Sequence, residues 1–167
     1  MANYKGHIIG GVIAGAVVAA GSYIYEAGSL PDTAILLADW QVLIGLLIVS
    51  VLFALWPDVD TNSKAQDLFI GIAFATDLLL IANGYYGAAA LLGLLAMTPI
   101  LGHHRGWTHS KIAMVLIPAP IALFPYFSSI DIGNSGLLFY AAAVAGYFSH
   151  LLLDGLIWKR FRIKGSW

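Results

Sequence analysis

Apolar residues occur in long runs along this chain, and short polar connections separate one run from the next. The runs lack the apolar–polar alternation of half-buried strands, and several approach the roughly 17 to 25 residues that a helix needs to cross a bilayer. The pattern predicts an all-α integral membrane helical bundle with about six transmembrane helices. The expected segments are residues 7–25, 34–56, 68–82, 88–101, 112–127 and 137–158.

Local sequence modifies some of these segments. The third and fourth are short and are joined by the turn-like stretch NGYYG at residues 83–87. Pro118, Pro120 and Pro125 are expected to kink the fifth segment or end it early. The small residues at positions 10–16 favour close helix contacts in the first segment.

Composition supports a membrane protein. Charged residues make up 10% of the chain, whereas soluble domains contain roughly 25%. The mean hydropathy of +0.84 leaves too few polar groups to cover a soluble globule. A length of 167 residues fits one transmembrane domain over residues 1–167. The chain contains no cysteine, so any bound metal ion must be held by histidine, carboxylate and water.

The basic residues predict the orientation of the six segments. If six spans are placed along the chain, every Lys and Arg falls on the side that holds both termini, and the opposite loops carry none. By the positive-inside rule, this basic side faces the cytoplasm, as expected for a protein of the inner membrane. The basic residues are Lys5, Lys64, Arg105, Lys111, Lys159, Arg160, Arg162 and Lys164.

Histidine and aspartate residues gather on the same side. They come from the start of the first segment, the WPDVD stretch after the second, the HHRGWTHS stretch at 103–110, and the end of the sixth. Imidazole and carboxylate without thiolate suit a divalent metal, with zinc expected and manganese or iron as alternatives. The set exceeds the need of one four-coordinate ion, so one or two ions are expected. The predicted metal ligands are His7, Asp58, His104, His109, His150 and Asp154.

Each element alone has an ordinary explanation. His7 alone would be an interfacial residue, Asp58 and Asp60 could cap a helix or lie in a solvated loop, and HHRGWTHS could be a wet loop. The pair His150 and Asp154, four residues apart on one helix face, is harder to dismiss. Ionisable groups within a span cost about 2.5–3.5 kcal/mol each and usually have partners or a function. A shared site is therefore favoured.

The residues beside these ligands suggest phosphoester chemistry. Arg105 is suited to hold a phosphate oxygen, and Asp60 could act as general base or orient a ligand. Thr108 and Ser110 could orient ligands or donate to substrate. Ser110 as a nucleophile activated by the adjacent His109 is disfavoured by geometry.

Four motifs in this order resemble the LexA-binding, inner-membrane-associated hydrolase family, the YdjM-like membrane-bound metal-dependent hydrolases. They are H-x-x-x-G from His7, P-D-x-D from Pro57, H-R-G-x-T-H-S from His104, and S-H-x-x-L-D from Ser149. Gly6 departs from the threonine expected before the first histidine, and His103 lies outside the pattern. The resemblance implies a multi-span helical protein with a metal-dependent hydrolase site. The ligand set is also similar in style to that of zinc-dependent phospholipases C, by analogy only.

These observations predict a hydrolase that cleaves a phosphoester of a phospholipid or lipid-linked substrate at the cytoplasmic membrane face. The expected partners are the lipid substrate and the membrane, with no nucleic acid. One alternative is a metal-ion or proton transporter, for which Asp39 and Asp77 are the additional acidic groups within spans. The other is a regulatory scaffold in which metal only fastens the helices together.

Overall fold

The computed structural model describes residues 3–29, 40–59, 64–101, 107–127 and 135–157, and within these residues the chain forms helices and no strands. The prediction of an all-α fold is therefore confirmed. Each of the six predicted segments corresponds to a helix or a helix pair. The elements are α1 (Tyr4–Ser29), α3 (Trp40–Leu55), the short 3-10 helix η1 (Trp56–Asp58), α4 (Lys64–Ala82), α5 (Tyr86–Leu101), α6 (Lys111–Leu116), α7 (Ala119–Phe127) and α8 (Ser135–Leu153).

The fifth predicted segment is broken in two. Pro118 lacks the backbone N–H that a continuous helix needs, so α6 ends at Leu116 and α7 begins at Ala119. Pro120 is accommodated in the first turn of α7, where backbone N–H groups have no partner within the helix. The expected kink is thus confirmed and is assigned to Pro118.

The predicted end of the last helix is wrong. The apolar run continues to Trp158, but α8 ends at Leu153 because Gly155 adopts a positive φ of 68°. Gly155 donates its N–H to the Leu152 carbonyl and Leu156 donates to the Leu151 carbonyl, which is the Schellman arrangement that closes a helix. Asp154 therefore directly follows the last residue of the helix, although the predicted segment continues to residue 158.

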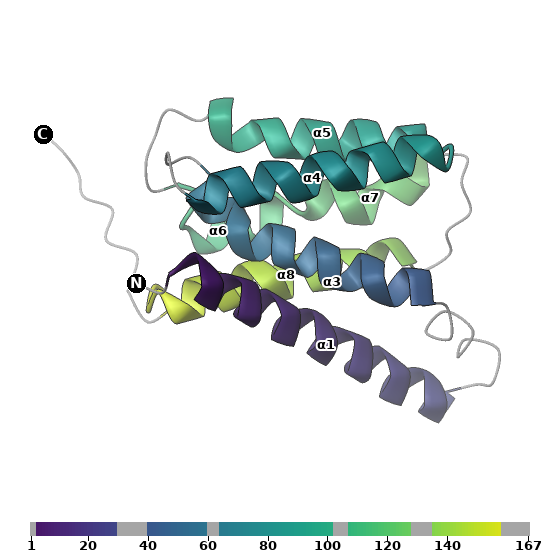
Figure 1. Ribbon diagram of the computed structural model, residues 1–167. Helices are drawn as coiled ribbons and strands as arrows, with labels where there is room; N and C mark the ends of the chain where they lie inside the picture. The colour runs from purple at the N-terminus through teal and green to yellow at the C-terminus, as the bar shows by residue number, and fades with distance from the viewer. Residues whose placement is uncertain (1–2, 30–39, 60–63, 102–106, 128–134, 158–167) are drawn as a thin grey trace, which may run out of the picture.

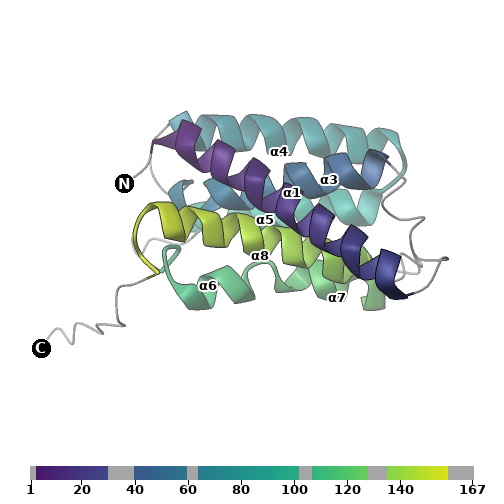
Figure 2. The ribbon, with the colours of Figure 1, turned by 90° about the horizontal axis from the view of Figure 1, so that it is seen from below.

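The helices run side by side, with α3 and α8 in the middle of the bundle (Figure 1). α1 packs against both of them, α4 packs against α3 and α5, and α7 packs against α8. Figures 1 and 2 show the start of α1, the ends of α3, α5 and α8, and the starts of α4 and α6 at the same end of the bundle. This end, called the site end below, holds Lys5, Lys64 and Lys111. The predicted clustering of basic residues on one side is confirmed for these three.

Hydrophobic side chains cover much of the outer surface, as a lipid environment requires. Large apolar residues such as Ile13 and Val17 on α1 are more than half exposed. Three stretches of the described helices are long and apolar enough to cross a membrane: Tyr4–Ile24, Trp40–Asp58 and Gly136–Leu153. The segments Tyr86–Met97 and Lys111–Leu123 are apolar but shorter.

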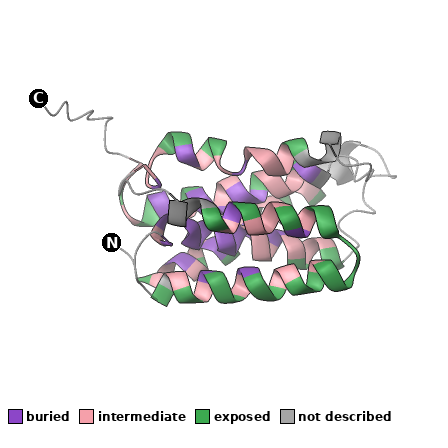
Figure 3. Ribbon diagram, turned by 90° about the horizontal axis from the view of Figure 1, so that it is seen from above, coloured by how far each residue is buried: buried purple, intermediate pink, exposed green. Residues whose placement is uncertain are grey.

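Burial is greatest at the site end of α3, where each residue from 50 to 57 is buried (Figure 3). Small residues permit this close packing. A Cβ added to Gly11 of α1 would lie 2.9 Å from the Val51 Cα, and a Cβ on Gly146 of α8 would overlap the Ser50 carbonyl oxygen. The Ser50 hydroxyl donates a 2.8 Å hydrogen bond to the Gly11 carbonyl. The expectation that small residues at 10–16 make close helix contacts is confirmed.

This packing predicts that Gly146→Ala destabilises the protein. The added methyl group must push α8 away from the α3 backbone, and overpacking of this kind costs about 1–3 kcal/mol. Gly71→Ala in α4 is the matched control, because nothing lies within 4 Å of a Cβ at that position. Thermal unfolding of both variants in detergent should show a clear loss for Gly146→Ala and no loss for Gly71→Ala. Equal midpoints would contradict the close α3–α8 contact.

Candidate metal centre

His150 is the best-anchored histidine of the site end. It lies in the last turn of α8 with its side chain fully buried, and its Nδ1 is 2.8 Å from the carbonyl oxygen of Ala54 in α3. A carbonyl only accepts hydrogen bonds, so Nδ1 must carry the proton and donate. In the neutral ring, Nε2 then presents its lone pair to the interior of the cluster. Metal-ligating histidines are commonly fixed in this way.

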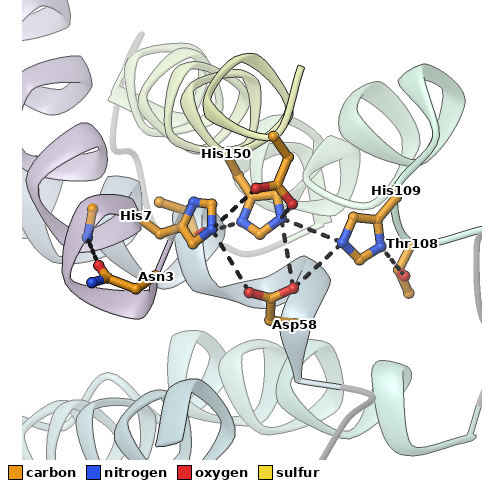
Figure 4. Close-up of polar contacts among 9 residues, drawn as sticks. Asn3, His7, Asp58, Thr108, His109 and His150 are labelled. Carbon is orange, nitrogen blue, oxygen red and sulfur yellow. Dashed lines mark hydrogen bonds and ion pairs between the residues drawn. The ribbon is translucent and has the colours of Figure 1, made fainter. Parts of the chain in front are cut away.

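Three donor atoms from three parts of the chain form a nearly equilateral triangle. The His109 Nε2 lies 3.4 Å from both the Asp58 Oδ1 and the His150 Nε2, and the latter two atoms are 3.7 Å apart (Figure 4). Ligands at zinc–ligand distances of 2.0–2.2 Å in a tetrahedron lie roughly 3.3–3.5 Å from one another. The triangle therefore has the size expected for three ligands of one ion.

His7 and Asp154 lie on the buried side of this triangle. The His7 Nε2 is 3.7 Å from the Asp154 Oδ1 and 3.9 Å from the Asp58 Oδ2. The Asp154 Oδ2 is 3.7 Å from the His150 Nε2. Both ring nitrogens of His7 are buried, and neither has a hydrogen-bond partner within the described part of the chain. Buried imidazole nitrogens are normally satisfied, so this ring has room for a partner such as a cation.

One side of the cluster is more exposed than the other. The side chains of His7, His150 and Asp154 are 1%, 0% and 2% exposed, whereas those of His109 and Asp58 are 21% and 29% exposed. One edge of the cluster, formed by His109 and Asp58, is thus open to the surroundings. Within the described residues, this is the edge at which a molecule from outside can reach the donor atoms.

An aromatic cluster supports three of the donor residues, and the sequence reasoning missed it. Trp56 contacts the rings of both Trp107 and Tyr147, with centroids 5.7 and 5.6 Å apart. The Trp56 indole N–H donates to the Leu95 carbonyl of α5, and the Tyr147 hydroxyl donates to the Thr108 carbonyl. A usable signal was present: each aromatic residue lies two or three positions before Asp58, His109 or His150.

Thr108 and Ser110 have structural contacts in the described residues. The buried Thr108 places its Oγ1 3.2 Å from the His109 Nδ1, so it can accept a hydrogen bond from an Nδ1–H, and the Nε2 of that tautomer carries the lone pair. The Ser110 Oγ accepts a 3.0 Å hydrogen bond from the Ala113 N–H and caps the start of α6. Ser110 therefore has a structural role as the N-cap of α6. Its predicted role in catalysis stays a prediction.

The structure brings together five of the six predicted ligands, namely His7, Asp58, His109, His150 and Asp154. The sixth ligand and three other residues of the predictions lie outside the described residues: His104, Arg105, Asp60 and Asp39. Asp77 lies in α4 and forms none of the ion pairs of the cluster; its buried Oδ1 has no hydrogen-bond partner within the described part of the chain. Nothing in the described residues connects it to the site.

The donor set fits a divalent metal ion. Two lone pairs on the His109 and His150 Nε2 atoms, 3.4 Å apart, repel each other unless a cation or a proton lies between them. Carboxylate oxygens lie beside both nitrogens, and the His7 ring nitrogens have no hydrogen-bond partner among the described residues. Nitrogen and oxygen donors without sulfur are compatible with zinc, manganese and iron.

Sequence comparison gives the family of the chain. No curated protein sequence and no solved structure matches it significantly. Residues 1–160 match the family described as YdjM inner membrane protein, and this match includes every predicted site residue. The membrane assignment that the apolar helices indicate agrees with that description. The chain therefore belongs to the YdjM inner membrane protein family.

Proposed function

We propose that the protein is a membrane-embedded, metal-dependent hydrolase that cleaves a phosphoester of a phospholipid or lipid-linked substrate at the cytoplasmic membrane face. The observation that carries the proposal is the triangle of Asp58, His109 and His150, with one partly exposed edge at the end of apolar helices. An ion held by these three residues would keep coordination sites for water or substrate at the partly exposed edge, as catalytic metal sites do.

The residues of the chain have distinct roles in this proposal. His109, His150 and Asp58 would hold a divalent ion at the open edge, and His7 and Asp154 would complete the set on the buried side. When bound, such an ion supplies Lewis acidity and activates water near neutral pH. Thr108 orients the His109 ring through Nδ1. By sequence position, Arg105 binds a phosphate oxygen and Asp60 accepts a proton.

The lipid substrate is proposed from the depth of the site. The donor atoms lie where α1, α3 and α8 reach the site end, so they are at the level at which an apolar bundle meets the headgroups of a bilayer. A headgroup phosphoester can reach the edge formed by His109 and Asp58 without leaving the membrane. By the positive-inside rule, this end is expected to face the cytoplasm.

A transporter is the second candidate, and one observation argues against it. Transport of metal or protons needs donor groups at several depths across the bilayer. The donor atoms in the described residues gather at one end, and Asp77 in α4 has no described histidine beside it. A scaffold fastened by metal remains a third candidate, and partial exposure of the outer edge favours catalysis over it.

Asp58→Asn is expected to abolish most phospholipid turnover. The substitution removes a charged ligand, and loss of one preorganised electrostatic group lowers rates on the order of 100-fold or more. Asp67→Asn is the matched control, because Asp67 is an exposed carboxylate in the first turn of α4 at the same end. Phosphate-ester release from mixed micelles, after loading with zinc or manganese, measures both variants. Equal turnover in the two variants, or none in the parent protein for any phospholipid class, would count against the hydrolase.

Thr108→Val is expected to weaken metal binding by about 10–100-fold, the usual effect of losing a group that orients a ligating histidine. Valine keeps the buried shape of threonine but cannot accept a hydrogen bond from the His109 Nδ1–H. Thr76→Val in α4 is the same replacement away from the site and should leave affinity unchanged. Competition with a fluorescent zinc chelator measures the dissociation constants. Identical constants for both variants would show that Thr108 does not orient His109.

Flux measurements separate the hydrolase from the transporter. Proteoliposomes containing the protein and an internal zinc- or pH-sensitive dye should show no protein-dependent ion movement, because the described donor atoms serve one end of the bundle. Vesicles containing Asp58→Asn protein provide the baseline. Protein-dependent flux that this substitution removes would establish transport instead.

A further inference from the structure

The rings of His7 and His150 are stacked, and this arrangement restricts what they can bind. Their centroids are 3.9 Å apart and their planes are inclined by only 19° (Figure 4). The lone pair of an imidazole nitrogen lies in the plane of its ring. Two lone pairs in nearly parallel planes do not converge on one point, so His7 and His150 cannot both be good ligands of a single ion. The ligand atoms of His7, His150 and Asp154 lie close enough together to suggest one shared ion, but the nearly parallel rings argue against it.

The two carboxylates of the cluster each face both of these histidines. The Asp154 Oδ1 is 3.7 Å from the His7 Nε2, and its Oδ2 is 3.7 Å from the His150 Nε2. The Asp58 Oδ2 is 3.9 Å from the His7 Nε2, and its Oδ1 is 3.7 Å from the His150 Nε2. Each carboxylate thus points one oxygen toward each ring, as a bridging ligand does.

We propose that the site binds two divalent ions bridged by Asp58 and Asp154, with His7 on the inner ion and His109 and His150 on the outer ion. This inference rests on the metal binding proposed above and specifies its stoichiometry and bridging ligands. The 3.9 Å separation of the stacked rings matches the roughly 3.5–4 Å spacing of ions in two-metal sites. Such sites are frequent in enzymes that cleave phosphoesters.

Charge balance favours an anionic ligand at such a pair of ions. Two divalent ions bring four positive charges, and the two bridging carboxylates bring two negative charges. The net positive charge that remains in a largely buried site favours an anionic ligand, which agrees with a phosphodiester or phosphomonoester group.

The two ions differ in accessibility. The inner ion is enclosed by His7 and Asp154, whose side chains are 1% and 2% exposed. The outer ion lies beside His109 and Asp58, which are 21% and 29% exposed. A chelator should therefore remove one equivalent quickly and the other slowly.

Manganese loading tests the inference without an activity assay. The purified full-length protein, dialysed against Mn²⁺ in detergent, is expected to retain two ions per chain by mass spectrometry of metals. Its electron paramagnetic resonance spectrum is expected to show exchange coupling between them. His7→Gln should retain one uncoupled ion. If His7→Gln does not fold, His109→Gln at the more exposed edge is measured instead and should likewise retain one uncoupled ion. Asp154→Asn should weaken or abolish the coupling, whereas the exposed Asp67→Asn should change neither number nor coupling.

The outcomes separate this inference from the proposed function. One uncoupled ion per chain in the parent protein, or two ions without coupling, overturns the bridged pair and leaves a metal-dependent hydrolase standing. No bound ion after loading with Mn²⁺ and then with Zn²⁺ overturns both proposals. Two coupled ions that persist unchanged in Asp154→Asn would remove Asp154 from the bridge.

Discussion

The hydrogen bond from the His150 Nδ1–H to the Ala54 carbonyl joins the last turn of α8 to the last turn of α3, and the rest of the site depends on it. It fixes the proton of the one imidazole that adjoins His7, His109, Asp58 and Asp154 alike. Close packing at Gly146 brings α8 against Ser50 of α3 beside this bond, and Gly11 brings α1 against Val51 of α3. The packing of three apolar helices thus fixes the direction in which the lone pair of the His150 Nε2 points.

Much of the arrangement could be predicted from the sequence because it follows from chain direction. When consecutive helical segments are joined by short connections, the end of one segment and the start of the next lie on the same side of the bundle. Every second connection, together with the two outer segment ends, therefore lies on one side. His7, Asp58, His109 and His150 are each next to such an end, so their gathering at one end of the bundle follows from topology. The small residues at 10–16 and the break near Pro118 follow equally from local steric rules.

Other features depend on interactions that a linear pattern does not contain. The apolar run past Asp154 favoured a longer helix, whereas Gly155 ended it through a conformation that other residues rarely adopt. Ser110 lies among candidate site residues in the sequence, and its hydroxyl caps α6 in the structure. The stacking of His7 on His150 and the support of Trp56 by Tyr147 require the tertiary packing itself.

The central claim is that these side chains bind divalent metal, and anomalous X-ray scattering from crystals of zinc-loaded protein tests it most directly. Data collected on both sides of the zinc absorption edge locate the ion without reference to any assumed chemistry. The account predicts an anomalous peak within bonding distance of the Nε2 atoms of His109 and His150 and of a carboxylate oxygen of Asp58. A fully loaded crystal with its zinc only at other surface residues, and none among these three, would contradict it.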